Sequence, residues 1–113
     1  MIRHVVLFSV RDPADLELVR AALARLAEIP EARRLEVAHN LKRDGLSAEI
    51  DLVVYGEFDD LAALDRYKAH PIYADSISIV RPRREIRIAV DFAATAAARA
   101  RPATPSGTGS RPG

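Results

Sequence analysis

The sequence contains IRHVVLFSV at residues 2–10 and IDLVVYGEF at residues 50–58, two stretches rich in β-branched and aromatic side chains. This composition predicts β-strands, in which successive side chains point to opposite faces of a sheet. Both faces of both stretches are largely apolar. In the first stretch one face has His4, Val6 and Phe8 and the other has Val5 and Leu7. In the second stretch one face has Leu52 and Val54 and the other has Val53 and Tyr55. Strands that are apolar on both faces are expected in the middle of a sheet.

A helix is predicted after the first strand. Asp12 is suited to cap its N-terminus, and Pro13 suits the first helical position. The helix continues to Glu28 and Pro30 ends it. Its buried stripe is indicated by apolar residues at three- and four-residue spacing, namely Leu16, Val19, Leu23 and Leu26.

A second helix is predicted after the strand at residues 50–58, with Asp59 or Asp60 as its cap. His70-Pro71 breaks this helix, because the residue before a proline disfavours the helical region, and a short helical piece follows at residues 72–80. Two more strands are predicted where apolar and polar residues alternate, at residues 35–41 and 83–92. In the last strand, Ile86, Ile88, Val90 and Phe92 share one side and Glu85, Arg87, Ala89 and Asp91 share the other.

The order strand-helix-strand-strand-helix-strand predicts an α+β, ferredoxin-like fold. In this fold a four-stranded antiparallel sheet has the first and third strands in its centre and both helices on one face. Two helices cover only one face, so the other face would expose an apolar patch built from Val5, Leu7, Val53 and Tyr55. A large exposed patch favours an interface, and we expect a homodimer with two-fold symmetry, joined through its sheets into a barrel. The alternative is that these four residues are isolated surface apolars.

Composition sets limits on the function. The chain has 113 residues, no cysteine and a formal net charge of +1, and residues 1–98 hold 14 of its 17 basic residues and all 16 acidic ones. Such a body lacks the basic surface that nucleic acid requires. Without cysteine there is no disulfide, thiolate catalysis or cysteine-ligated metal. No apolar run is long enough to span a membrane, so we expect neither a membrane nor a nucleic-acid partner and a cytoplasmic location.

One domain is predicted at residues 1–92, followed by a tail at residues 93–113. The tail consists mainly of Ala, Arg, Pro, Thr, Ser and Gly, with no large aliphatic or aromatic residue. Because such a segment cannot bury enough apolar surface to offset the entropy of ordering, disorder is expected.

Common nucleotide, zinc-protease, hydrolase and calcium motifs are absent, so the candidate site rests on single residues. His4 shares a strand face with Val6 and Phe8, and beneath the helices it would be placed to act as a general base. The competing interpretation is a hydrogen-bonded core histidine. Tyr67 and Tyr73 can orient a substrate through their hydroxyls or simply pack. The remaining pocket candidates are Val6, Phe8, Val19, Leu23, Val54 and His70, and no metal site is predicted because no two histidines have ligand spacing.

Four pieces occur together over residues 1–92: MIRHVVLFSV at the start, Ile29-Pro30, DLVVYGEFDDLAALDRYKAHP at residues 51–71, and RIAVDF at residues 87–92. In this combination the sequence resembles the stress-responsive dimeric α/β-barrel (Dabb) domain family, which includes a plant polyketide cyclase. The resemblance implies a ferredoxin-like protomer and a homodimer joined through its sheets.

For the cyclase subgroup the resemblance implies a catalytic tyrosine on the second helix, which Tyr67 matches. It also implies a histidine two residues after the His-Pro proline, where this sequence has Tyr73. His4 is then the histidine that can take over as base, with Tyr67 and Tyr73 orienting the substrate.

These observations lead to three functional hypotheses. The first is a homodimer with a small apolar cavity in each protomer that binds a small organic molecule. The second is a cofactor-independent enzyme, similar to a polyketide cyclase, that acts on an aromatic or polyketide-like substrate. The third is a purely structural or stress-associated dimer.

Overall fold

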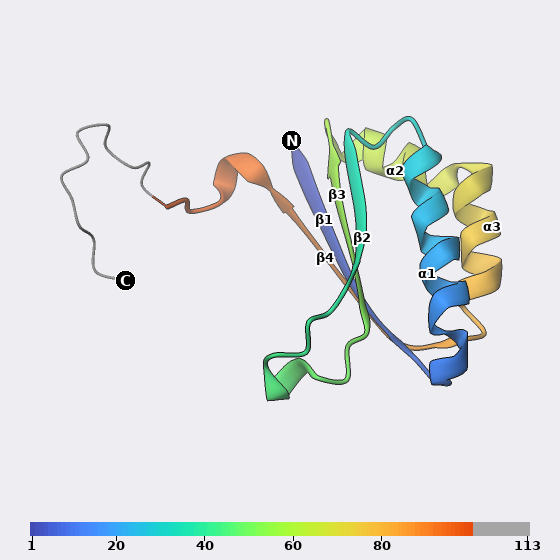
Figure 1. Ribbon diagram of the computed structural model, residues 1–113. Coiled ribbons are helices and arrows are strands. Elements are labelled where there is room, and N and C mark those ends of the chain that lie inside the picture. Colours follow the sequence, from blue (N-terminus) through green and yellow to red (C-terminus); the bar gives the residue numbers. More distant parts are fainter. Residues whose placement is uncertain (101–113) are drawn as a thin grey trace.

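The computed structural model describes residues 1–100. One antiparallel sheet carries three α-helices on one of its faces (Figure 1). The strands are β1 Ile2–Val10, β2 Arg34–His39, β3 Leu52–Phe58 and β4 Arg84–Ala93, and the helices are α1 Leu16–Ala24, α2 Leu61–Ala69 and α3 Pro71–Val80. Short 3-10 helices lie at η1 Pro13–Asp15, η2 Arg25–Glu28, η3 Gly45–Ser47 and η4 Ala94–Ala96.

The strand order is β2-β3-β1-β4, and every neighbouring pair is antiparallel. The two doubly apolar strands β1 and β3 therefore occupy the centre, as predicted. The ferredoxin-like α+β fold is confirmed.

Both predicted caps form, but the predicted first helix is α-helical only over Leu16–Ala24, with the 3-10 helices η1 and η2 at its two ends. The Asp12 carboxylate accepts a hydrogen bond from the Ala14 amide at 2.9 Å, and that of Asp60 accepts one from the Ala63 amide at 2.8 Å. Asp60, rather than Asp59, is thus the cap of α2. The predicted break at His70 separates α2 from α3, and the His70 ring accepts a hydrogen bond from the Ile72 amide.

The core lies between the helices and one sheet face. Its contributors from the strands and helices are Val6, Phe8, Val19, Ala22, Leu23, Leu52, Val54, Phe58, Ala63, Leu64, Tyr67 and Val80, each at most 5% exposed. Burial of one of the larger of these side chains contributes about 1.5–3 kcal/mol relative to leaving it exposed, so this layer supplies the main driving force for folding.

The opposite sheet face carries no helix (Figure 1). In register, Val5 lies between Tyr55 and Val90, and Leu7 lies between Val53 and Ile88. The apolar side of β4 therefore extends the predicted patch on the bare face. Ile88 is 49% exposed and Val90 54% exposed in the single chain.

Three strand boundaries differ from the predicted ones, and the first is that β3 begins at Leu52 rather than at Ile50. β2 ends at His39 because the Asn40 side chain turns the chain by donating to the Ser47 and Ile50 carbonyls, which leaves Leu41 exposed. β4 continues to Ala93, and the amide of buried Ala94 donates to the Met1 carbonyl at 2.8 Å. Residues 101–113 lie outside the described part, so disorder of the tail stays a prediction. No helix among residues 1–100 has the length and apolar character needed to cross a membrane.

Candidate functional site

His4 lies near the start of β1, on the face covered by the helices. It is 1% exposed, and its Nδ1 is 2.5 Å from the Asp91 Oδ1, in a contact that joins β1 to β4. The partner of His4 on the other neighbouring strand is Gly56 of β3. The candidate site thus draws its residues from the two central strands β1 and β3 and from the edge strand β4.

Gly56 makes room for the aromatic neighbours of His4. A Cβ atom at this position would lie 2.9 Å from Cε1 of Phe58 and 3.2 Å from Cδ2 of Leu35, closer than side chains normally pack. The missing side chain lets the Phe58 ring stand next to His4, at a centroid distance of 6.1 Å in an edge-to-face arrangement.

The two predicted tyrosines join the same cluster. The Tyr67 ring of α2 is fully buried and lies 6.3 Å from the His4 ring, 4.8 Å from Phe58 and 5.2 Å from Tyr73 of α3, measured between centroids. The structure therefore brings His4, Tyr67 and Tyr73 together as a chain of rings. The Nδ1 partner of His4 is the Asp91 carboxylate rather than a tyrosine hydroxyl.

Burial sets the charge of this cluster. It lowers the pKa of His4, while the hydrogen bond and charge of Asp91 oppose that shift and Lys68 and Arg87 add to it. His4 is consequently neutral at neutral pH. Because a carboxylate accepts at Nδ1, the proton of the neutral ring is at Nδ1, and Nε2 carries the free lone pair. Burial also raises the pKa of Tyr67, which keeps its phenol protonated.

The β4 edge is the least covered side of the site. Ala89 and Asp91 lie on the helix face of β4, opposite Val6 and His4, yet both are exposed. The Asp91 side chain is 34% exposed, whereas that of His4 is 2% exposed. Solvent therefore reaches the Asp91 carboxylate from the β4 side, while the His4 ring stays buried.

The predicted lining residues are part of the packed core. Val6, Phe8, Val19, Leu23 and Val54 are buried in one cluster. His70, by contrast, uses its Nδ1 to cap α3. A pocket of about 220 Å³ lies at the other end of β1, lined by Val10, Pro13, Leu16, Lys42 and Asp51, none of which is in the predicted set. The apolar cavity at His4 stays a prediction.

Asp91, Phe58 and Gly56 were missed as site residues by the sequence reasoning. Strand alternation did place Asp91 and Arg87 on one side of the last strand, but it could not show that this side faces His4. That relationship depends on the register between β1 and β4. In the part of the chain that the structure describes, no three His, Asp or Glu side chains gather closely enough to hold a metal ion.

Comparisons with known proteins agree with this architecture. Residues 2–94 match the model of the "Stress responsive A/B Barrel Domain" family. No curated protein matches the sequence significantly. A crystal structure described as a dimeric ferredoxin-like protein of unknown function from Thermobifida fusca is 31% identical, with a TM-score of 0.70 over 81% of this chain and 89% of that one.

Two further crystal structures are similar. A dimeric protein of unknown function with a ferredoxin-like fold from Bacteroides fragilis is 26% identical, with a TM-score of 0.68 over 80% of this chain and 93% of that one. A protein of the same domain family from Mesorhizobium loti is 22% identical, with a TM-score of 0.68 over 81% and 94% of the two chains. The family match over residues 2–94 includes the sheet and the helices that build the His4 cluster.

Proposed function

The chain belongs to the stress-responsive A/B barrel domain family, and from this we propose that it is a homodimer that binds a small organic molecule beside His4. The observation that carries the proposal is the buried His4 ring, held by Asp91 at 2.5 Å among the rings of Phe58 and Tyr67. Aromatic walls with a few convergent polar groups are typical of sites for small organic ligands.

The bare sheet face supports the dimer. Val5 and Leu7 in its centre, flanked by Ile88 and Val90 on β4, form one continuous apolar surface. Soluble proteins seldom leave such a surface in water. Two similar structures are described as dimeric, and a second copy placed by a two-fold axis would cover this face with an identical one.

Access to the ring cluster is best from β4. The small side chain of Ala89 lies between Arg87 and Asp91 on the helix face of that strand, and Arg87 is only half-buried. A ligand entering there would meet the His4–Asp91 pair and the positive charge of Arg87, which acts on both His4 and Tyr67. We therefore expect an aromatic or enolisable molecule with a polar oxygen.

A second candidate function is proton transfer, and the Asp91 contact specifically favours it. Asp91 accepts from Nδ1–H, which orients the ring and leaves Nε2 free to take a proton from a carbon next to a carbonyl. A protonated tyrosine hydroxyl in the ring cluster would donate to the carbonyl oxygen as negative charge develops there. No bound cofactor is needed for this step.

Binding is tested by two-dimensional NMR with 2,4-dihydroxyacetophenone, an aromatic ketone, at millimolar concentration. We expect amide shifts confined to residues around His4, Tyr67 and Asp91, and their loss in Asp91→Ala. His39→Gln is the matched control, because His39 is an exposed histidine on the edge strand β2. Shifts spread over the whole surface, or none at all, would contradict the binding proposal.

Proton transfer is tested with 5-nitrobenzisoxazole, from which a base removes the C3 proton while the N–O bond breaks to give a cyanonitrophenolate. We expect the wild-type protein and His39→Gln to accelerate this reaction above buffer, with a rate that rises as His4 becomes neutral. His4→Gln should reduce the rate to the buffer level. Equal rates for the two histidine variants would exclude His4 as the base.

A further inference from the structure

The connection between β2 and β3, residues 40–51, holds two leucines in water. We call it the β2–β3 arm. Leu46 is 95% exposed and Leu41 is 83% exposed, and these are the two most exposed large hydrophobic residues of the described chain. A single exposed leucine is ordinary, but two on one ordered connection call for an explanation.

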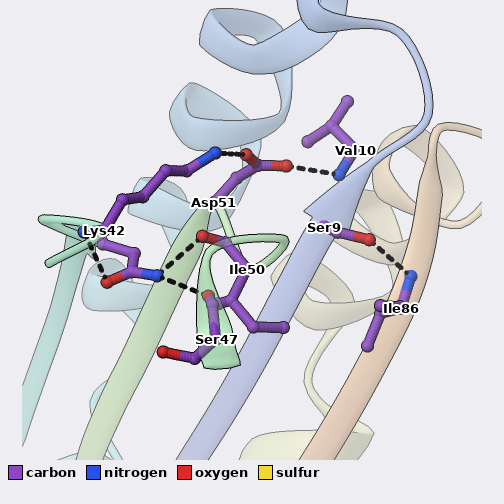
Figure 2. A network of polar contacts seen from close by, with 8 residues as sticks. Ser9, Val10, Lys42, Ser47, Ile50, Asp51 and Ile86 are labelled. Carbon is purple, nitrogen blue, oxygen red and sulfur yellow. Dashed lines mark hydrogen bonds and ion pairs between the residues drawn. The ribbon is translucent and has the colours of Figure 1, made fainter. Parts of the chain in front are cut away.

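The arm is internally braced. The Asn40 amide nitrogen donates to the Ser47 carbonyl at 3.0 Å and the Ile50 carbonyl at 2.8 Å, and its oxygen accepts from the Lys42 amide at 3.0 Å (Figure 2). Within η3, the Asp44 carboxylate accepts from the Leu46 amide at 2.8 Å. The backbone polar groups that position Leu46 are thus satisfied within the arm.

The arm is also tied to the central strand. The Asp51 carboxylate accepts from the Val10 amide at 2.9 Å and pairs with Lys42 Nζ at 2.7 Å (Figure 2), and the Asp51 amide donates to the Phe8 carbonyl. Lys42 adopts a left-handed φ of 56°, which is unfavourable for a residue other than glycine. With these contacts formed, Leu46 lies in solvent instead of packing against its own chain.

The direction of the arm indicates what covers it. Figure 1 shows that η3 projects from the end of the sheet on the side away from the helices, which is the side of the bare face. The base of the arm adjoins this face, where Ala38 of β2 pairs with Val53 of β3. The arm therefore continues the apolar surface proposed to meet a second copy.

We propose that the β2–β3 arm clasps the partner protomer, with Leu46 and Leu41 packed against the second copy of this chain. The inference rests on the proposed dimer. A second copy is the partner that fits, because the two exposed leucines continue the apolar bare face, while the exposed charges of the arm are of both signs, Arg43 against Asp44 and Glu49. In a two-fold symmetric dimer every contact between the protomers occurs twice, so the arm contributes to the free energy of dimerisation two times.

Sedimentation equilibrium of the wild type, Leu46→Ser and Leu41→Ser tests the clasp. We expect each variant to remain folded by circular dichroism, because the side chain it loses is exposed, and to raise the dimer dissociation constant by at least about tenfold. Leu61→Ser is the matched control, since Leu61 is a 61% exposed leucine on α2, on the helix side. This control should dimerise as the wild type does.

The results separate the two proposals. A monomeric wild type would contradict the proposed dimer itself. A dimeric wild type with unchanged dissociation constants in both arm variants would overturn the clasp and leave the dimer standing.

A cross-linking experiment tests contact directly, because the chain has no native cysteine. A maleimide benzophenone attached to Leu46→Cys is expected to yield a covalent dimer on illumination, whereas the same probe on Leu61→Cys is expected to yield monomer. Products of Leu46→Cys that join the probe only to its own chain would overturn the inference.

Discussion

Nδ1 of His4 and Oδ1 of Asp91 lie 2.5 Å apart, although 87 positions separate the two residues in the chain. The contact joins the central strand β1 to the edge strand β4 beneath the helices. It fixes the tautomer of His4, and through it the position of the free lone pair. The pair is thus both a cross-strand link and the chemical centre of the candidate site.

Asp91→Asn tests the linking role. The substitution removes a charged acceptor from a buried ring, so we expect the free energy of unfolding to fall by about 1–3 kcal/mol in urea denaturation. Because Asp91 raises the pKa of His4, NMR titration should show that pKa moving further down. Asp65→Asn, an exposed position on α2, should change neither quantity. An unchanged His4 titration in Asp91→Asn would contradict the contact.

The stability of the protein should depend on pH through His4. Its pKa in the folded state is lowered from 6.5 by burial, so the unfolded chain binds the proton more readily. The contribution of neutral His4 to the free energy of unfolding is fully present above pH 6.5. It is lost as the pH falls through 6.5 toward the lower pKa of the folded state, because the unfolded chain takes up the proton first. Denaturation between about pH 5 and pH 8 should show this slope in the wild type and a smaller one in His4→Gln. His39 and His70 remain in both proteins, so equal slopes would rule out His4 as the source.

Gly56→Ala tests the packing beside His4. The added Cβ would lie 2.9 Å from the Phe58 ring, so we expect a loss of about 1–3 kcal/mol in the free energy of unfolding. Gly45→Ala is the control, because a Cβ at Gly45 meets nothing within 4 Å and should change stability by less than about 0.5 kcal/mol. Equal stabilities of the two variants would mean that Phe58 has room to move away.

Val90→Asp tests the bare sheet face. Val90 is 54% exposed in the single chain and lies next to Val5 in register, so a carboxylate there would be buried without a partner in the proposed dimer. We expect a folded monomer by light scattering and circular dichroism. Leu18→Asp, at a 45% exposed leucine of α1, should leave the dimer intact. A dimeric Val90→Asp protein would move the interface elsewhere.

Short sequence patterns were enough to predict much of the fold. The doubly apolar residues 2–10 and 50–58 indicated the two central strands, and Asp60 and His70-Pro71 located the start of α2 and the break between α2 and α3. Each signal involves residues a few positions apart, and their order restricts the topology to a small number of folds. The same alternation predicted which residues of β1 and β3 lie on the bare face.

The site was only partly predictable. Alternation placed His4 on the side of Val6 and Phe8, and the family resemblance directed attention to Tyr67 and Tyr73. Nothing local connected Asp91 to His4 or made Gly56 a neighbour of the ring, because both relationships depend on strand register. Likewise, a leucine in a turn gives no sign that hydrogen bonds of Asn40 will hold it away from the chain.

The amino-acid order alone therefore determined the strands, the helices and the apolar faces, since side-chain periodicity and caps act over one or two turns of chain. Tertiary structure alone decided that Asp91 meets His4 and that the arm with Leu46 projects beyond the bare face. The physical reason is that these relationships arise only when distant segments pair and pack, which positions side chains by the geometry of the whole sheet rather than by their neighbours in sequence.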